Sequence, residues 1–139
     1  MKELTVPAAP EQLGAVTAFV SSEIAACPKK ARIQIETAVE EIFVNIARYA
    51  YHPETGTATI RCEAKDGVVT IQFLDRGRPF DPLKRRAADT TLSAEKRGVG
   101  GLGILMVRES MDAVDYAYEG GMNRFTIKKK FGIPGRRSV

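Results

Sequence analysis

Hydrophobic residues recur with two different periods along the chain, and each change of period marks a new element. Residues 2–6 alternate between polar and apolar side chains and stop at Pro7, as a short edge strand would. Apolar residues at helical spacing then predict a helix over residues 11–26, which Pro28 ends. The same spacing predicts a second helix over residues 29–51. The first part of the chain is therefore a strand followed by two helices.

The pattern changes again in the second part of the chain. Alternation over residues 57–74, broken by the tight-turn pair Asp66-Gly67, predicts a β-hairpin. Residues 76–100 have no sustained period and are rich in Gly, Pro, Arg and Lys, which is typical of a lid or a binding loop. A third helix is expected over residues 102–111. A second hairpin is expected across Gly120-Gly121, with strands near residues 113–119 and 122–130.

This order of elements predicts the fold class. Strands and helices are segregated along the chain, which favours an α+β two-layer sandwich with helices on one face of a largely antiparallel sheet. The 139 residues fit one domain of ordinary size. We expect a single domain over residues 1–130 and a basic C-terminal tail over residues 131–139.

The charge distribution matters more than its sum of +4. Five basic residues lie within residues 128–139, and residues 76–97 carry about four net positive charges. Nucleic acid could explain either cluster, but no aromatic residues interleave the tail and no nucleic-acid motif accompanies it. A solvated tail without direct nucleic-acid contact is expected. No apolar run approaches the ~20 residues of a membrane span, so we expect a cytoplasmic protein without a membrane partner.

The two cysteines and the single histidine exclude several kinds of metal and catalytic site. Cys27 and Cys62 stand alone, without the paired spacing of a zinc site or a redox dithiol, and are expected to be small buried side chains. His52 is the only histidine, which counts against a Ser-His-Asp hydrolase and against a complete histidine kinase.

The second helix carries a candidate pair. Glu41 and Asn45 lie one turn apart and flank the apolar stripe of that helix. An amide oxygen suits Mg²⁺, and a carboxylate suits orienting or deprotonating a nucleophile. The alternative is an ordinary amphipathic helix with Glu40 and Glu41 on its wet side. The stripe consists of Ile35, Val39, Ile42 and Ile46.

Two further segments suit a nucleotide. Asp75 ends a buried strand, where it can accept a hydrogen bond from an exocyclic amine, and Gly77 lets the chain turn away from a ring. The alternative for Asp75-x-Gly77 is a plain turn. The glycines of residues 98–103 lead into the third helix, where backbone N–H groups and the helix dipole favour a phosphate. No Lys-Ser/Thr pair follows them, so this is not a P-loop.

Three motifs in this order resemble the nucleotide boxes of the GHKL, or histidine-kinase-like, ATPases. The resemblance spans about residues 32–130 and is closest to the small anti-sigma factor kinases of the RsbW type. The motifs are Glu41-x-x-x-Asn45, Asp75-x-Gly77-x-x-Phe80-Asp81 and Gly98-x-Gly100-Gly101-x-Gly103.

The resemblance implies a site for ATP and Mg²⁺ between helices and a mixed sheet, with a mobile lid between the second and third motifs. By position, Glu41 would be the catalytic base, Asn45 the Mg²⁺ ligand and Asp75 the acceptor for the adenine amine. Arg97 would neutralise the γ-phosphate. Other nucleotide-binding positions would be Gly77 and Phe80 at the base, Gly98, Gly100, Gly101, Leu102 and Gly103 at the phosphates, and Asn123 through water.

The resemblance also implies an activity and partners. The chain would be an ATP-dependent protein serine/threonine kinase that forms a homodimer, sequesters a sigma factor and phosphorylates a Ser or Thr of an anti-sigma antagonist. One alternative is a module that uses ATP as a switch without phosphotransfer, and another is a detached catalytic domain of a sensor histidine kinase. Glu41 favours the kinase, because a switch has no need of a base.

The chain departs from the family pattern at two places. Tyr49 stands where the family usually has His, and its aromatic packing is compatible with that position. Met122-Asn123-Arg124 replaces the usual Gly-Thr-Thr of the last hairpin. Neither departure removes the expected base or metal ligand.

Overall fold

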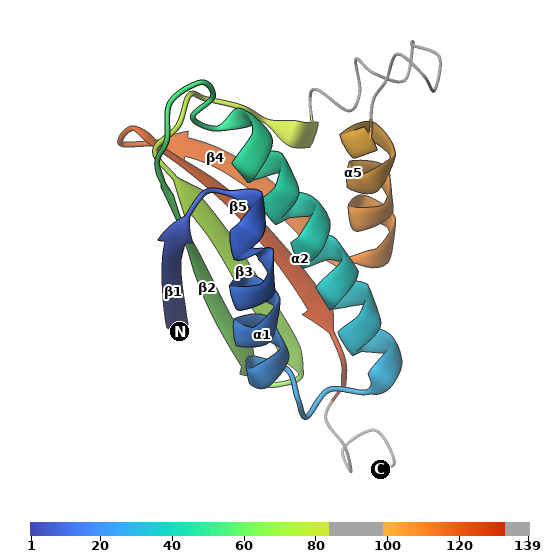
Figure 1. The fold of residues 1–139 in the computed structure, drawn as a ribbon. Coiled ribbons are helices and arrows are strands. Elements are labelled where there is room, and N and C mark those ends of the chain that lie inside the picture. Colours follow the sequence, from blue (N-terminus) through green and yellow to red (C-terminus); the bar gives the residue numbers. More distant parts are fainter. Residues whose placement is uncertain (84–98, 133–139) are drawn as a thin grey trace.

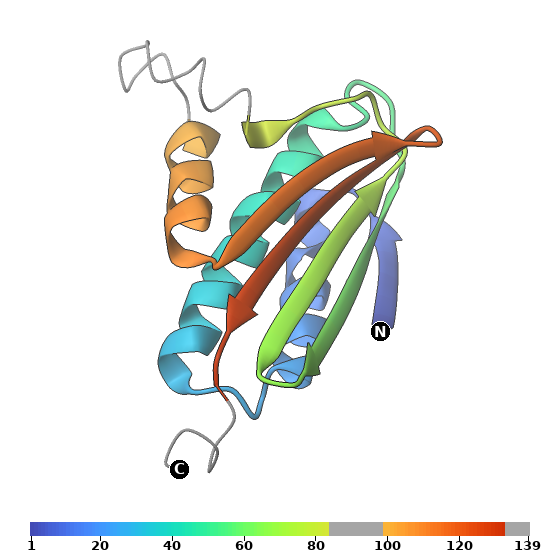
Figure 2. The same cartoon turned by 180° about the vertical axis from the view of Figure 1, so that it is seen from behind.

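In the described part of the chain, helices α1, α2 and α5 cover one face of a five-stranded sheet and no helix covers the other (Figures 1 and 2). This arrangement comes from a computed structural model, which describes residues 1–83 and 99–132. It confirms the α+β two-layer fold class. The elements are β1 (Lys2–Pro7), η1 (Pro10–Gln12), α1 (Leu13–Glu23), α2 (Lys29–Tyr49), β2 (Thr57–Lys65), β3 (Val68–Asp75), α5 (Val99–Ser110), β4 (Ala113–Glu119) and β5 (Met122–Lys130).

The strand order is β1-β2-β3-β5-β4, and every pairing in the described chain is antiparallel. The expected mixed sheet is corrected here to an antiparallel one. Strands β3 and β4, which are connected through α5, do run in the same direction. However, β5 lies between these two strands and pairs with both, so the strands with equal direction are never neighbours.

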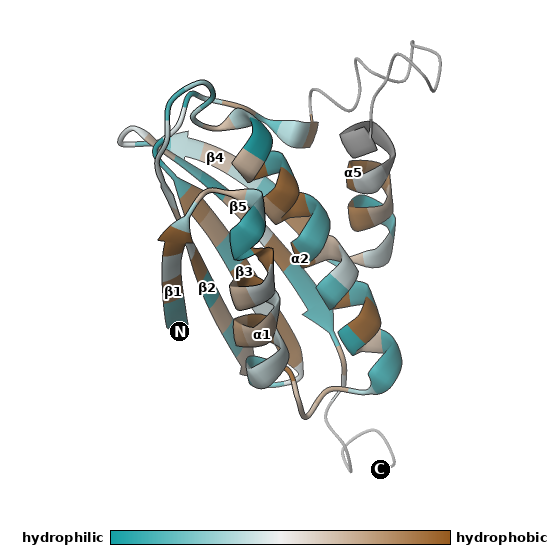
Figure 3. Cartoon of the chain, viewed as in Figure 1, coloured by the Kyte–Doolittle hydropathy of each residue, from teal (hydrophilic) through white to brown (hydrophobic). Residues whose placement is uncertain are grey.

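The core lies between the helices and the inner sheet face. Figure 3 shows hydrophobic and hydrophilic positions alternating along the strands, as a sheet with one buried face requires. Both cysteines are free and buried in this core, as expected. The largest fully buried side chains are Val16, Val20, Ile24, Ile35, Val39, Ile42, Phe43, Ile60, Val69, Ile71, Phe73 and Ile127.

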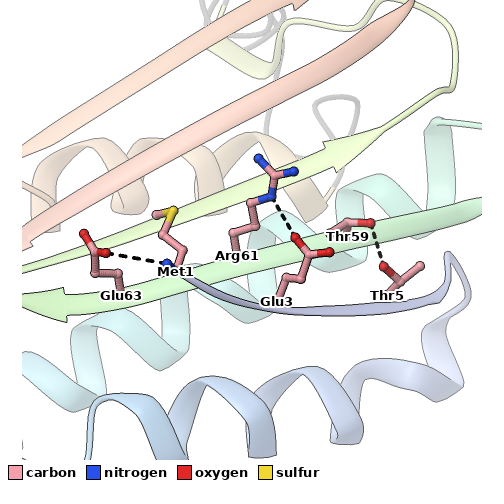
Figure 4. A network of polar contacts seen from close by, with 6 residues as sticks. All are labelled: Met1, Glu3, Thr5, Thr59, Arg61 and Glu63. Atoms are coloured by element: carbon pink, nitrogen blue, oxygen red, sulfur yellow. Dashed lines mark hydrogen bonds and ion pairs between the residues drawn. The ribbon is translucent and has the colours of Figure 1, made fainter.

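Strand β1 pairs with β2 at the sheet edge, and side chains of the two strands also contact each other (Figure 4). Arg61 Nε donates to Glu3 Oε1 at 3.0 Å, and the hydroxyls of Thr5 and Thr59 are 2.8 Å apart. Exposed pairs of this kind contribute little free energy each. Both pairs join residues that are also partners in the backbone register between β1 and β2.

The helix boundaries differ from the predicted ones. Helix α2 ends at Tyr49, two residues before the predicted end, and Arg78 binds the carbonyl groups there: its backbone N–H donates to Ala50 O and its guanidinium donates to Tyr49 O and His52 O, each at 3.1 Å. Helix α5 begins at Val99, three residues before the predicted start.

The predicted lid of residues 76–100 lies mostly outside the described residues, which omit 84–98. No helix in the described chain is both long and apolar enough to span a bilayer.

Candidate functional site

A pocket lies between helices α2 and α5 and the inner face of the sheet. Its wall is mostly apolar, as binding sites for planar rings are, and three buried polar side chains are set into it: Asn45, Asp75 and Asn123. Two of the predicted motifs therefore meet in one place. The other lining residues are Ile42, Ile46, Ala50, Phe73, Phe80, Pro82, Ile104, Tyr116 and Phe125.

Asp75 presents a buried carboxylate at the end of β3. Its side chain is 7% exposed, and its Oδ1 accepts hydrogen bonds from Gly77 N–H and Asn123 Nδ2, both at 2.9 Å. Burial raises the pKa of Asp75, and these two hydrogen bonds counteract that rise. The second oxygen, Oδ2, accepts no hydrogen bond from the described residues. A buried acceptor without a donor in a pocket is a place for a ligand amine.

Asn45 is the second buried polar group of the pocket that has no partner among residues 1–83 and 99–132. Its side chain is 6% exposed on the inner side of α2, and none of the described residues hydrogen-bonds its amide. A buried amide costs free energy unless it is hydrogen-bonded or coordinates an ion, so this position needs a ligand to explain it. The helical angle predicted Asn45 at the flank of the core, and the structure places it inside the pocket.

Glu41 lies one turn earlier on α2, in a hollow beside this pocket. It is half-buried and packs against Gly103 of α5: a Cβ atom added at residue 103 would come within 1.9 Å of Glu41 Cδ. Burial raises the pKa of Glu41, Arg48 counteracts that rise, and Glu40 adds to it. Glu40 is exposed and Glu41 is not, so the two glutamates do not share one wet face.

Gly77 packs against the backbone of Ala50, which lines the pocket. A Cβ atom at this position would come within 2.1 Å of Ala50 O, so only glycine lets the turn after β3 pack against the end of α2. Its backbone N–H also holds Asp75 in place. Gly77 thus shapes the site through the backbone.

Phe80, which lines the pocket, forms an aromatic pair with Tyr49, which does not. Their ring centroids are 5.5 Å apart with 28° between the ring planes, which is a stacked arrangement. Phe80 lines the pocket directly, as predicted for the base-binding motif. The Tyr49 departure therefore keeps an aromatic role next to the pocket.

The structure adds one residue that the sequence reasoning missed. The Tyr116 hydroxyl donates to Asn123 Oδ1, and both residues line the pocket. The signal was present in the alternation of β4, which puts Val114 and Tyr116 on the inner face and Asp115 on the outer one.

The third motif is described only in part. Arg97 and Gly98 lie outside the described residues, as does the side chain of Leu102. Gly100, Gly101 and Gly103 lie within α5, although the sequence predicted most of these glycines ahead of the helix. Gly103 contacts Glu41, so part of this motif serves close helix packing.

The residues present suit a nucleotide with a magnesium ion. The described chain contains no group of three or more His, Cys, Asp or Glu residues that could hold a metal alone. Mg²⁺ is commonly bound by one or two protein oxygens together with substrate phosphates, and the unpartnered Asn45 amide offers such an oxygen. Asp75 Oδ2 offers the acceptor that an adenine amine requires.

Comparison with known proteins shows the family to which the chain belongs. The model of the histidine kinase-like ATPase domain matches residues 6–129. The chain belongs to this family. Solved histidine kinase-like ATPase structures share its fold: the catalytic domain of histidine kinase ThkA has a TM-score of 0.57 at 12% identity, covering 95% of this chain and 99% of that one. Histidine kinase AdeS of Acinetobacter baumannii has a TM-score of 0.52 at 16% identity, covering 96% of this chain and 69% of that one.

Curated relatives of this histidine kinase-like ATPase are named as regulators and as a kinase. The anti-sigma F factor of Clostridium beijerinckii is 29% identical over 101 residues, which are 71% of each chain. The anti-sigma F factor of Clostridium botulinum is 30% identical over 102 residues, also 71% of each chain. The serine/threonine-protein kinase BtrW of Bordetella bronchiseptica is 25% identical over 99 residues, 69% of this chain and 68% of that one.

Proposed function

We propose that this chain is an ATP-dependent protein serine/threonine kinase that acts as an anti-sigma factor. It would sequester a sigma factor, phosphorylate an anti-sigma antagonist protein, and work as a homodimer. The observation that carries the proposal is the pocket in which Asn45 and Asp75 both present buried polar atoms to which no described residue hydrogen-bonds, with Glu41 one helical turn from Asn45. The names of the relatives support the regulatory setting.

Different residues of the pocket bind different parts of the nucleotide and its metal ion. Asp75 Oδ2 accepts a hydrogen bond from the adenine amine, while the apolar wall and Phe80 contact the ring. Asn45 holds Mg²⁺ through its amide oxygen. When bound, ATP supplies the phosphoryl group and Mg²⁺ neutralises charge on the phosphates. The nucleotide and Mg²⁺ together satisfy two buried groups to which no described residue hydrogen-bonds, Asp75 Oδ2 and the Asn45 amide, and this favours binding.

Glu41 receives the proton of the acceptor hydroxyl. In the transfer step, the Ser or Thr oxygen of the antagonist forms a bond to the γ-phosphorus, and the bond from that phosphorus to the β–γ bridging oxygen breaks. The hydroxyl proton goes to Glu41, and ADP leaves. Burial against Gly103 raises the pKa of Glu41, which brings this carboxylate closer to the basicity that proton transfer near neutral pH favours. Arg97, outside the described residues, remains our candidate for γ-phosphate neutralisation.

The experiment is a transfer assay with the full chain. The wild-type protein is mixed with γ-labelled ATP, Mg²⁺ and a purified single-domain antagonist protein from the same genome, and label on the antagonist is followed. Nucleotide binding is measured in parallel by calorimetry. Label on a Ser or Thr of the antagonist supports the kinase. Binding of ATP and antagonist without transfer would favour a switch module, and absence of ATP binding would contradict both readings.

A further inference from the structure

The side chain of Asn123 lies at the centre of a hydrogen-bond network in the wall of the pocket. Its Nδ2 donates to Asp75 Oδ1 and to the carbonyl oxygen of Arg78, both at 2.9 Å, and contacts the carbonyl oxygen of Gly77 at 3.3 Å. Asn123 is 5% exposed, so these are buried interactions. The amide thus ties β5 both to the end of β3 and to the turn that follows it.

The oxygen of the same amide is engaged just as fully. Asn123 Oδ1 accepts hydrogen bonds from the Tyr116 hydroxyl and from Phe80 N–H, the latter at 3.2 Å. The Phe80 N–H also lies 3.1 Å from the Tyr116 oxygen. Burial raises the pKa of Tyr116, so its hydroxyl stays a protonated donor at neutral pH. Donors on one side and acceptors on the other fix which way the amide faces.

This arrangement determines what Asn123 can do for a nucleotide. Both hydrogens of Nδ2 and both lone pairs of Oδ1 already have partners inside the protein, so no polar position is left for a base. The network instead acts on Asp75. Asn123 and Gly77 together occupy Oδ1, which leaves Oδ2 as the carboxylate oxygen that accepts no hydrogen bond from the described part of the chain.

We propose that Tyr116 and Asn123 are positioning residues for adenine selection, because they hold Asp75 with one oxygen occupied and the other available to the adenine amine. The proposal rests on the proposed function, since it requires that the pocket bind an adenine nucleotide. It adds two residues on β4 and β5 whose effect passes through Asp75.

The test separates positioning from general support of the fold by comparing two nucleotides. ATP and purine riboside triphosphate differ only in the 6-amino group, so only ATP gains from a well-placed acceptor at Asp75. Tyr116→Phe removes one hydroxyl from the network and keeps the ring. The matched control is Tyr118→Phe on the same strand, because Tyr118 is 44% exposed and does not line the pocket. Calorimetry with Mg²⁺ gives both affinities, and thermal unfolding checks each variant.

The expected result is a loss of affinity for ATP but not for purine riboside triphosphate. Tyr116→Phe should weaken ATP binding roughly 2- to 10-fold, the range for one hydrogen bond, and leave the affinity for purine riboside triphosphate unchanged. Asn123→Asp, which replaces the donor facing Asp75 with an acceptor, should give a larger loss of the same kind. Tyr118→Phe should match the wild type.

Other outcomes overturn the proposal. Equal losses for the two nucleotides in Tyr116→Phe would mean that the network only supports the fold. Unchanged affinities for both nucleotides would mean that Asp75 needs no positioning. A wild-type protein that binds neither nucleotide would instead remove the proposed function, and the positioning role would fall with it.

Discussion

The carboxylate of Glu41 occupies the space that a side chain at residue 103 would fill. The backbone of residue 103 in helix α5 lies this close to the Glu41 side chain of α2 because residue 103 is glycine. The proposed base is therefore held between two helices, half-buried and with a raised pKa, next to the pocket that Asn45 and Asp75 line.

A methyl group at residue 103 should displace the base. In Gly103→Ala the carboxylate end of the Glu41 side chain must move, because the new Cβ would lie 1.9 Å from its Cδ. Since this end is flexible, the free energy of unfolding should change little, while phosphotransfer falls by about 10²-fold, as for a reacting group misplaced by ~1 Å. Gly14→Ala is the control, because nothing lies within 4 Å of a Cβ at this position of helix α1. Wild-type transfer by Gly103→Ala would refute this role of the contact.

Asp75→Asn should weaken the binding of both ATP and ADP. The substituted amide can keep its oxygen on Gly77 and Asn123 and would then turn its NH₂ group to the adenine amine, which places donor against donor at a cost of ~1–3 kcal/mol. Calorimetry measures the affinities. Equal affinities for wild type and variant would remove Asp75 from the base site.

The same variant should not lose stability without nucleotide at pH 7. The pKa of Asp75 is raised, so its ionised form is disfavoured in the folded state, and the wild type loses stability as the pH rises through the unfolded-state value near 3.8. Asn removes that charge. Denaturant unfolding of apo protein should give Asp75→Asn a free energy of unfolding equal to or above that of the wild type; a clear decrease would show that the carboxylate is structural.

Asn45→Ala should reduce the contribution of Mg²⁺ to nucleotide binding. The substitution removes the one buried amide that no described residue hydrogen-bonds, and with it the proposed metal ligand. ATP titrations with Mg²⁺ and with EDTA give the metal-dependent difference, which should shrink in the variant. If the metal-dependent difference is the same in both proteins, Asn45 is not a ligand.

Phosphotransfer should decline in acid with an apparent pKa above 4.5, the ordinary value for Glu. A base works only when ionised, and burial raises the pKa of Glu41, so the acid limb moves to higher pH. Because the folded state then holds this proton more tightly than the unfolded state, protonating Glu41 favours folding and does not cause acid unfolding. The profile of kcat isolates this group from effects on nucleotide affinity, and an acid limb at or below 4.5 would contradict the assignment.

Local patterns predicted most elements because each element buries one face. The stripe of α2 and the alternation of β2 and β3 follow directly from this, and the helical angle placed Glu41 and Asn45 correctly beside the core. The pairing of β5 with β4 follows from the predicted second hairpin, but its pairing with β3 was not predictable in this way, because period-2 alternation does not say which strands are neighbours. Tyr116 enters the site through that pairing.

The start of α5 was mispredicted for a related reason. Glycine has low helix propensity, so the glycine segment looked like a loop before the helix. Gly103 lay inside the predicted helix, but its contact was not predicted: the absence of a side chain there admits the Glu41 carboxylate. Such contacts join residues far apart in sequence, and only the fold reveals them.

The most direct measurement is phosphotransfer by Glu41→Gln alongside its ATP affinity. Glutamine keeps the size of the side chain packed against Gly103 and loses the ability to accept a proton. The proposed function predicts wild-type ATP binding together with transfer to the antagonist that is roughly 10²–10⁴-fold slower, the usual range for loss of a general base. Transfer at the wild-type rate would contradict it.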